Sequence, residues 1–102
     1  MNKNARKIAF VLLLLFIAGT VAVFALPDEQ ERLVIRRGYM DGWTAASNLR
    51  DPALAERNGG ALKRNSMDNA TRRLPREEQS AYRNGWSMGW DDQLAGNPHR
   101  YW

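Results

Sequence analysis

The 102-residue chain contains no cysteine and a single histidine, His99. It therefore forms no disulfide, no zinc–thiolate site and no thiol nucleophile. His99 has no companion at metal-ligand spacing and lies close to the C-terminus, so we expect an exposed bystander. The adjacent Asp91 and Asp92 point about 100° apart on a helix, which predicts a solvated face rather than a catalytic pair. The sequence predicts a protein that is not an enzyme and that binds no cofactor, metal ion or small-molecule substrate.

Charged side chains are absent from a run of nineteen residues, 8–26, in which Thr20 is the one polar side chain. A helix of this length spans roughly 28 Å, close to the ~30 Å hydrocarbon thickness of a bilayer. Residues 1–7 form a basic flank, whereas acidic residues follow the run directly. The positive-inside rule then places the N-terminus in the cytoplasm and exports residues 27–102 to the periplasmic or extracellular side. We predict a single-pass transmembrane helix, a signal-anchor, with the lipid bilayer as a partner.

The same segment also has features of a cleavable signal peptide. Val23-Phe24-Ala25 fits a small-residue cleavage pattern after a basic and an apolar region. The apolar run is longer than the usual apolar region of roughly 7–15 residues, which favours an uncleaved anchor. If cleavage occurs, the alternative is a secreted helical binding module.

A surplus of basic residues gives the chain a formal charge of +4. The location of these basic residues in the sequence argues against nucleic-acid binding. Residues 1–7 hold three of the fifteen Lys and Arg residues, and the remaining twelve face eleven acidic residues. Residues 27–102 therefore carry a balanced surface rather than a concentrated basic patch.

Residues 27–102 contain an internal repeat. Leu26-Pro27-Asp28-Glu29 is echoed by Leu74-Pro75-Arg76-Glu77, and each is followed by two glycines four residues apart, with an aromatic residue after each glycine. Proline at a helix start, an acidic first turn and aromatics at four-residue steps predict a helix in each copy, over 27–49 and 74–96. The paired glycines and aromatics are Gly38, Tyr39, Gly42 and Trp43 in the first copy, and Gly85, Trp86, Gly89 and Trp90 in the second.

A Gly-x-x-x-Gly pair lets a second backbone approach one face of a helix closely. We predict that the two repeat helices pack glycine face to glycine face, with the four aromatics sealing the edges. Two other interpretations stay open: a docking groove for a partner helix, and a ligand pocket. The predicted fold class is all-α, with one N-terminal transmembrane helix followed by a small helical hairpin built from the two repeats.

The rest of the exported part divides into a polar linker, residues 50–73, and an aromatic tail, residues 97–102. Asp51 as N-cap and Pro52 at the first helical position predict a short helix over 52–57, and a second follows over 61–68. We expect the linker to be a solvated connection, with contact to anionic lipid headgroups or an acidic partner as the alternative. The tail ends in Tyr101 and Trp102, which either fold onto the core or anchor an interface.

Two short segments resemble the motifs of ribosome modulation factor, a family of small helical ribosome-binding proteins of bacteria. They are Arg37-Gly38-Tyr39-Met40-Asp41-Gly42 and Trp86-Ser87-Met88-Gly89-Trp90-Asp91. The segment between them is longer than in that family, whose members are cytoplasmic and have no anchor. The resemblance implies a two-helix fold and, as an alternative function, a membrane-associated ribosome- or RNA-binding regulator. Its C-terminus would then lie in the cytoplasm.

The function predicted from the sequence is that of a non-enzymatic accessory subunit or assembly factor of a larger membrane or envelope complex. Its partner would be another membrane protein or a second copy of the chain. The residues predicted to make the contact are Gly38, Tyr39, Gly42, Trp43, Gly85, Trp86, Gly89, Trp90, Tyr101 and Trp102.

Overall fold

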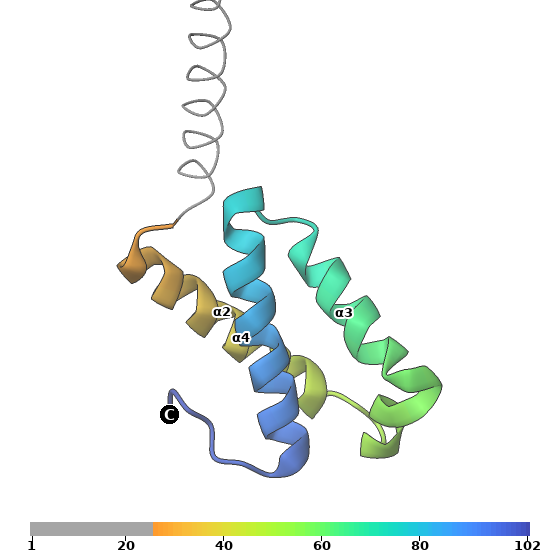
Figure 1. Ribbon diagram of the computed structural model, residues 1–102. Helices are drawn as coiled ribbons and strands as arrows, with labels where there is room; N and C mark the ends of the chain where they lie inside the picture. The colour runs from red at the N-terminus through yellow and green to blue at the C-terminus, as the bar shows by residue number, and fades with distance from the viewer. Residues whose placement is uncertain (1–25) are drawn as a thin grey trace, which may run out of the picture.

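The computed structural model describes residues 26–102, in which every regular element is a helix. In chain order these are α2 (Asp28–Ser47), the 3₁₀ helix η1 (Pro52–Gly59), α3 (Ala61–Thr71) and α4 (Arg76–Ala95) (Figure 1). The all-α prediction is confirmed over this range.

The predicted transmembrane span, 8–26, lies outside the described residues except for Leu26. This leucine precedes α2 and packs, partly buried, against the core of the domain. Among the helices of residues 26–102, none is both long enough and apolar enough to cross a bilayer.

The two repeats begin with the same backbone geometry. Pro27, with φ −55° and ψ 145°, precedes α2, and Pro75, with φ −53° and ψ 144°, precedes α4. Acidic side chains occupy the first turn of both helices, where the helix dipole favours negative charge. At the other end of α4, Gly96 takes the left-handed conformation with φ 75°, which ends the helix and redirects the chain into the tail.

The segment predicted as a polar linker is largely helical. The Asp51 carboxylate accepts a hydrogen bond from the Ala53 backbone N–H at 3.0 Å, and η1 begins at Pro52. Asn58 interrupts the helical geometry with φ 52°, and Gly60 starts α3 from the left-handed region. α3 extends three residues beyond the predicted range of 61–68, and its apolar side packs against the core.

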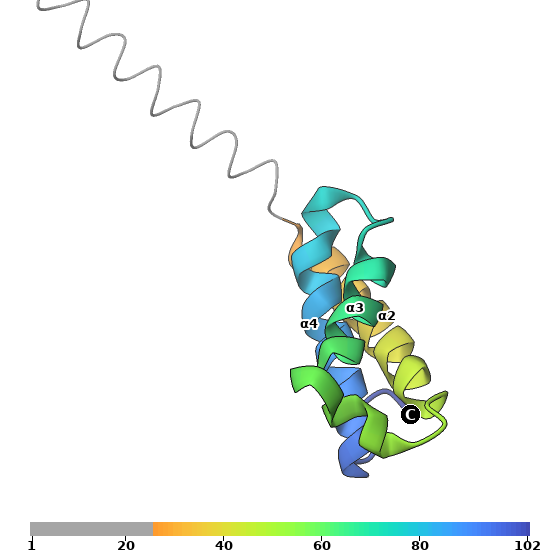
Figure 2. The same ribbon diagram turned by 90° about the vertical axis from the view of Figure 1, so that its right-hand side faces the viewer.

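The helices α2 and α4 run in the same direction, so the predicted hairpin is wrong. Ile35 lies against Gly85 and Tyr39 lies against Gly89, so successive turns of α2 meet successive turns of α4. A hairpin would bring the end of one helix beside the start of the other. The segment between them reverses the chain instead: α3, about 16 Å long, carries it back to the end of the domain where α2 began (Figures 1 and 2).

The glycines of both repeats lie in the interface between α2 and α4, as predicted. A Cβ atom at Gly42 would overlap the carbonyl oxygen of Trp86 and lie 2.9 Å from its Cα. No real side chain fits there, because the obstacle is backbone that cannot rotate away. The other three glycines meet the same kind of obstacle: Gly38 at Tyr82, Gly85 at Ile35, and Gly89 at Tyr39.

These contacts have an internal two-fold relation. Over the glycine–aromatic motifs, a position of α2 corresponds to the position 47 residues later in α4, as Gly38 does to Gly85. The Gly38–Tyr82 contact thus has its counterpart in Gly85–Ile35, and Gly42–Trp86 has its counterpart in Gly89–Tyr39. The duplication seen in the sequence is a duplication of packing as well.

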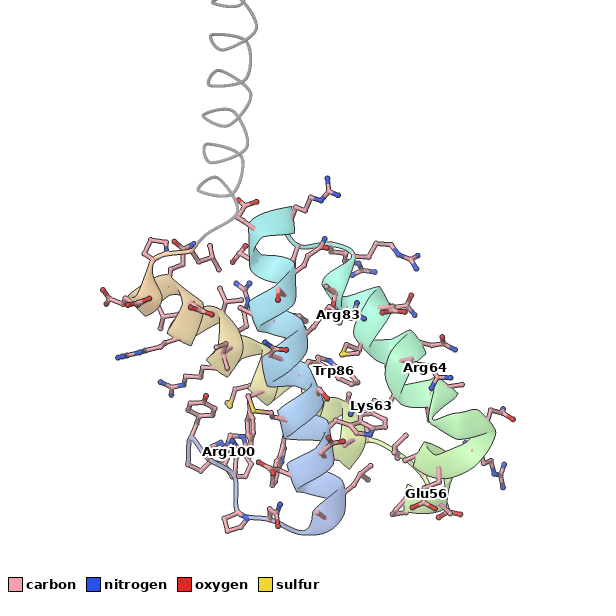
Figure 3. The ribbon with its side chains drawn as sticks, viewed as in Figure 1. Glu56, Lys63, Arg64, Arg83, Trp86 and Arg100 are labelled. Carbon is pink, nitrogen blue, oxygen red and sulfur yellow. The ribbon has the colours of Figure 1, made fainter. Side chains whose placement is uncertain are left out.

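The aromatic pairs occupy equivalent positions on the two helices, but different segments of the chain cover them. Trp86 and Trp90 stack with ring centroids 5.2 Å apart, and Trp86 points toward α3 (Figure 3). Tyr39 and Trp43 stack at 6.2 Å and are covered by the C-terminal tail. The tail and α3 lie on opposite sides of the α2–α4 pair (Figure 1).

Replacing Gly42 with alanine should lower the free energy of unfolding by more than about 2 kcal/mol, because the new Cβ overlaps backbone of α4. The gain in helix propensity, about 1 kcal/mol, offsets only part of this loss. Urea unfolding followed by tryptophan fluorescence measures the change. Ser80→Ala, on the exposed face of α4, is the control and should stay within about 0.5 kcal/mol of the wild type. A Gly42→Ala variant as stable as the wild type would contradict this packing.

Candidate functional site

Most of the predicted contact residues are used inside the domain. Tyr39, Trp86 and Trp90 are buried, with Tyr39 0% exposed, and the four repeat glycines are covered by the opposing helix. Trp43 is partly buried. The interpretation of these motifs as core is therefore the one that the geometry supports, and they leave no groove for a partner helix between α2 and α4. Of the ten residues, Tyr101 and Trp102 are the ones that remain exposed.

The tail is held by a polar cluster that joins three parts of the chain. The Tyr39 hydroxyl donates to the Asp92 carboxylate at 2.6 Å, and the Arg100 Nε donates to the same oxygen at 2.8 Å. The Asn97 amide donates to the other oxygen at 3.1 Å, while the Arg100 backbone N–H donates to the Tyr39 hydroxyl oxygen at 3.3 Å. One carboxylate on α4 thus binds α2 and the tail together.

This cluster changes the acidity of its members. Hydrogen bonds from Tyr39, Arg100 and Asn97 lower the pKa of Asp92 from 3.8 to about 2, against the effect of its burial, which would raise it. Burial and the bond to Asp92 raise the pKa of the Tyr39 hydroxyl above 10.0. The prediction of a solvated Asp92 is wrong, because α2 and the tail close over it. Three donors bind the carboxylate, so it serves as a fixed anion rather than as a reactive base.

His99 is buried, which corrects the prediction of an exposed bystander. Its ring stacks on Trp102 at 4.0 Å and 4° and meets the rings of Tyr39 and Trp43 edge-on at 4.9 and 4.7 Å. Its Nδ1 accepts a hydrogen bond from the Tyr101 backbone N–H at 3.2 Å. Nε2 has no hydrogen-bond partner among residues 26–102, and its surroundings are ring faces and edges. The ring acts as a spacer that fixes the terminal tryptophan.

The accessible part of the site is an aromatic and cationic patch, here called the tail patch, which consists of Arg36, Trp43, Tyr101 and Trp102. Trp102 is 82% exposed although its ring is fixed against His99 and lies 5.7 Å from that of Trp43. The guanidinium carbon of Arg36 lies 5.5 Å from the centroid of the Tyr101 ring. Tryptophan, tyrosine and arginine are the residues most often found at the energetic centres of protein interfaces.

Sequence reasoning missed Asp92, Asn97, His99 and Arg100 as the residues that build this site. The sequence contained one usable signal: the tail carries a cation and two large aromatics a few residues after Asp91-Asp92. Among residues 26–102, no group of three or more acidic or histidine side chains is placed to hold a metal ion.

The stability of the protein should fall as the pH drops from 3.8 toward 2, because protonation of Asp92 removes the acceptor of three hydrogen bonds. Its pKa is lower in the folded state, so its contribution is complete above 3.8 and lost as the pH approaches about 2. The measurement is the urea-unfolding midpoint at several pH values between 3.8 and 2. In an Asp92→Asn variant, we expect the fall of this midpoint that is due to protonation of Asp92 to be absent. Asp91→Asn, which leaves the cluster intact, should keep it. If the urea midpoint of Asp92→Asn falls between pH 3.8 and 2 as steeply as that of the wild type, the cluster does not hold the fold.

No protein-family model matches the chain, and neither a curated protein nor a solved structure is significantly similar to it. The function of the site is therefore inferred from its own residues and geometry.

Proposed function

We propose that the protein is a non-enzymatic, single-pass membrane protein that acts as an accessory subunit or assembly factor of a larger membrane or envelope complex. In this proposal the apolar segment 8–26 holds the chain in the bilayer, and the tail patch binds the extramembrane part of a partner protein. The observation that carries it is Trp102, which is 82% exposed yet held in one position by its contacts with His99 and Trp43. A large aromatic side chain fixed in solvent loses little entropy when a partner covers it.

The tail patch is remote from the point at which the chain enters the domain. The tail starts after α4, at the end of the domain opposite to Leu26, where the chain enters from the predicted anchor (Figure 1). Trp43 lies fifteen residues after Asp28 along α2, about 22 Å along the helix axis. The predicted anchor and the tail patch therefore use different parts of the domain.

The chemistry of the site supports a binding role. The buried carboxylate is neutralised by Arg100 and bound by two further donors, and the histidine is enclosed by aromatic rings. Neither group is placed to move a proton to or from a substrate.

A ribosome- or RNA-binding regulator resembling ribosome modulation factor is the alternative, supported by the two short motifs. In this structure the glycines and most of the aromatics of those motifs pack against each other. The secreted binding module would use the same tail patch without an anchor. The three proposals differ in where residues 27–102 reside and whether residues 8–26 are retained.

The full-length chain should remain in the membrane pellet after an alkaline wash, with residues 27–102 on the exported side. The absence of cysteine makes this measurable, since a single Glu56→Cys variant in the exposed η1 can be labelled with a membrane-impermeant maleimide. Labelling of intact cells supports the proposed orientation. Labelling only after lysis would favour the ribosome-binding alternative, and a released chain without its first residues would favour the secreted one.

A photoreactive amino acid in place of Trp102 should cross-link one membrane protein in native membranes, because this side chain lies at the centre of the tail patch. The matched control places the same probe at Glu56, which is exposed on η1, near the start of α3 and remote from Arg100 of the tail (Figure 3). Mass spectrometry identifies the adduct. The same adduct from both positions, or none from position 102, would contradict docking through the tail patch. A separate Trp102→Ala variant should unfold near the wild-type midpoint yet lose the partner on detergent extraction.

A further inference from the structure

A second surface of the domain lies at the start of α2. An open groove of about 510 Å³ runs beside this helix, and its walls include Pro27, Gln30, Leu33 and Val34. Across the groove, Glu78 of α4 forms an ion pair with Arg37 at 3.1 Å. The lining is mostly apolar with a charged edge, the composition of a small docking surface.

Leu33 is the most exposed leucine of the domain, with 61% of its surface accessible. Its counterpart in the second repeat, 47 positions later, is Ser80, which is also exposed. The neighbouring pair, Val34 and Ala81, is buried in both repeats. The fold thus requires an apolar residue at the buried position but accepts a serine at the exposed one. Packing within the domain does not explain the leucine at position 33.

The charges around Leu33 are arranged so that this face complements itself. Glu29 lies one turn before Leu33 and Arg37 one turn after it, so all three share the outer face of α2. When two such helices meet antiparallel about a two-fold axis at Leu33, each Glu29 comes beside the Arg37 of the other copy. The exposed leucine and the apolar groove lie on the same patch, as an isologous contact requires.

We propose that a second copy of this chain covers the groove, with the α2 helices antiparallel and the two Leu33 side chains in contact at the two-fold axis. Each Arg37 then lies between Glu78 of its own chain and Glu29 of the other copy. The guanidinium group has five donors, enough for both carboxylates. The two-fold axis of this dimer is perpendicular to α2. When that axis is parallel to the membrane normal, the two copies lie on the same side of the membrane, and both chains can enter the same bilayer.

The strength of this contact rests on the proposed membrane attachment. A contact confined to residues 29–37 is smaller than the ~800 Å² per partner that stable soluble complexes bury. Confinement of two copies to one membrane raises their effective concentration and compensates for the small area. We therefore expect the dimer to be populated in membranes and to weaken on dilution in detergent.

The native chain lacks cysteine, so a single Leu33→Cys substitution in the full-length protein reports this contact directly. A disulfide requires Cβ atoms about 3.8 Å apart, and residues on a two-fold axis meet this condition with their own copies. Mild oxidation of membranes should give several-fold more disulfide-linked dimer than the matched control, Ser80→Cys, at the equivalent exposed site of the second repeat. Adding Glu29→Arg to Leu33→Cys should reduce the dimer several-fold, since two arginines then face each other.

The possible outcomes separate this inference from the proposed function. A chain that stays in the membrane but gives equal, weak cross-linking at positions 33 and 80 overturns the dimer and leaves the membrane attachment intact. A disulfide from position 33 to a different protein also overturns it. A chain absent from the membrane pellet contradicts the proposed function. A disulfide between two copies of the Leu33→Cys variant in the soluble fraction would then still establish the contact. Urea unfolding of Leu33→Ser, expected near the wild-type midpoint, shows that residue 33 is not needed for the fold itself.

Discussion

Close approach of two parallel helices at four glycines is the constraint on which the rest of this structure depends. The backbone of α4 occupies the space that a Cβ on α2 would need, and the reverse holds at the glycines of α4. Glycine in a helix costs about 0.8–1.0 kcal/mol relative to alanine, so four of them are tolerated only where contact recovers the loss. Here the recovery comes from backbone packing and from the aromatic side chains that follow each glycine and line the contact.

The two-fold relation between α2 and α4 creates two equivalent aromatic edges, the Tyr39–Trp43 pair on α2 and the Trp86–Trp90 pair on α4. Different segments of the chain cover these two edges. α3 lies against the Trp86 edge and is tied to α4 by ion pairs from Lys63 and Arg83, at 2.9 and 2.8 Å. The tail covers the Tyr39 edge with side chains instead of a helix, and it leaves Trp102 in solvent. A symmetric core thus supports an asymmetric surface, and this asymmetry is what gives the domain a distinct binding face.

Much of the local structure could be predicted from the sequence, because its causes are local. Proline before an acidic turn starts both long helices, Asp51 caps η1, and the spacing of glycine and aromatic residues identifies the face that packs. The burial of Asp92 and His99 could not be predicted in this way. A carboxylate at a helix end and a histidine in a tail are exposed unless a distant segment covers them, and here the covering groups are Tyr39 and the rings around it.

The sequence by itself determined that the domain is all-α, close to which residues the two long helices begin, and that glycine faces hold these two helices together. Only the tertiary structure decided that these helices are parallel, because direction depends on where the connecting segment delivers the chain and not on the pattern of either helix. The tertiary structure likewise decided which aromatics are core and which are surface. Burial is a property of what lies opposite a residue, and for the tail that neighbour is a helix some sixty positions earlier in the chain.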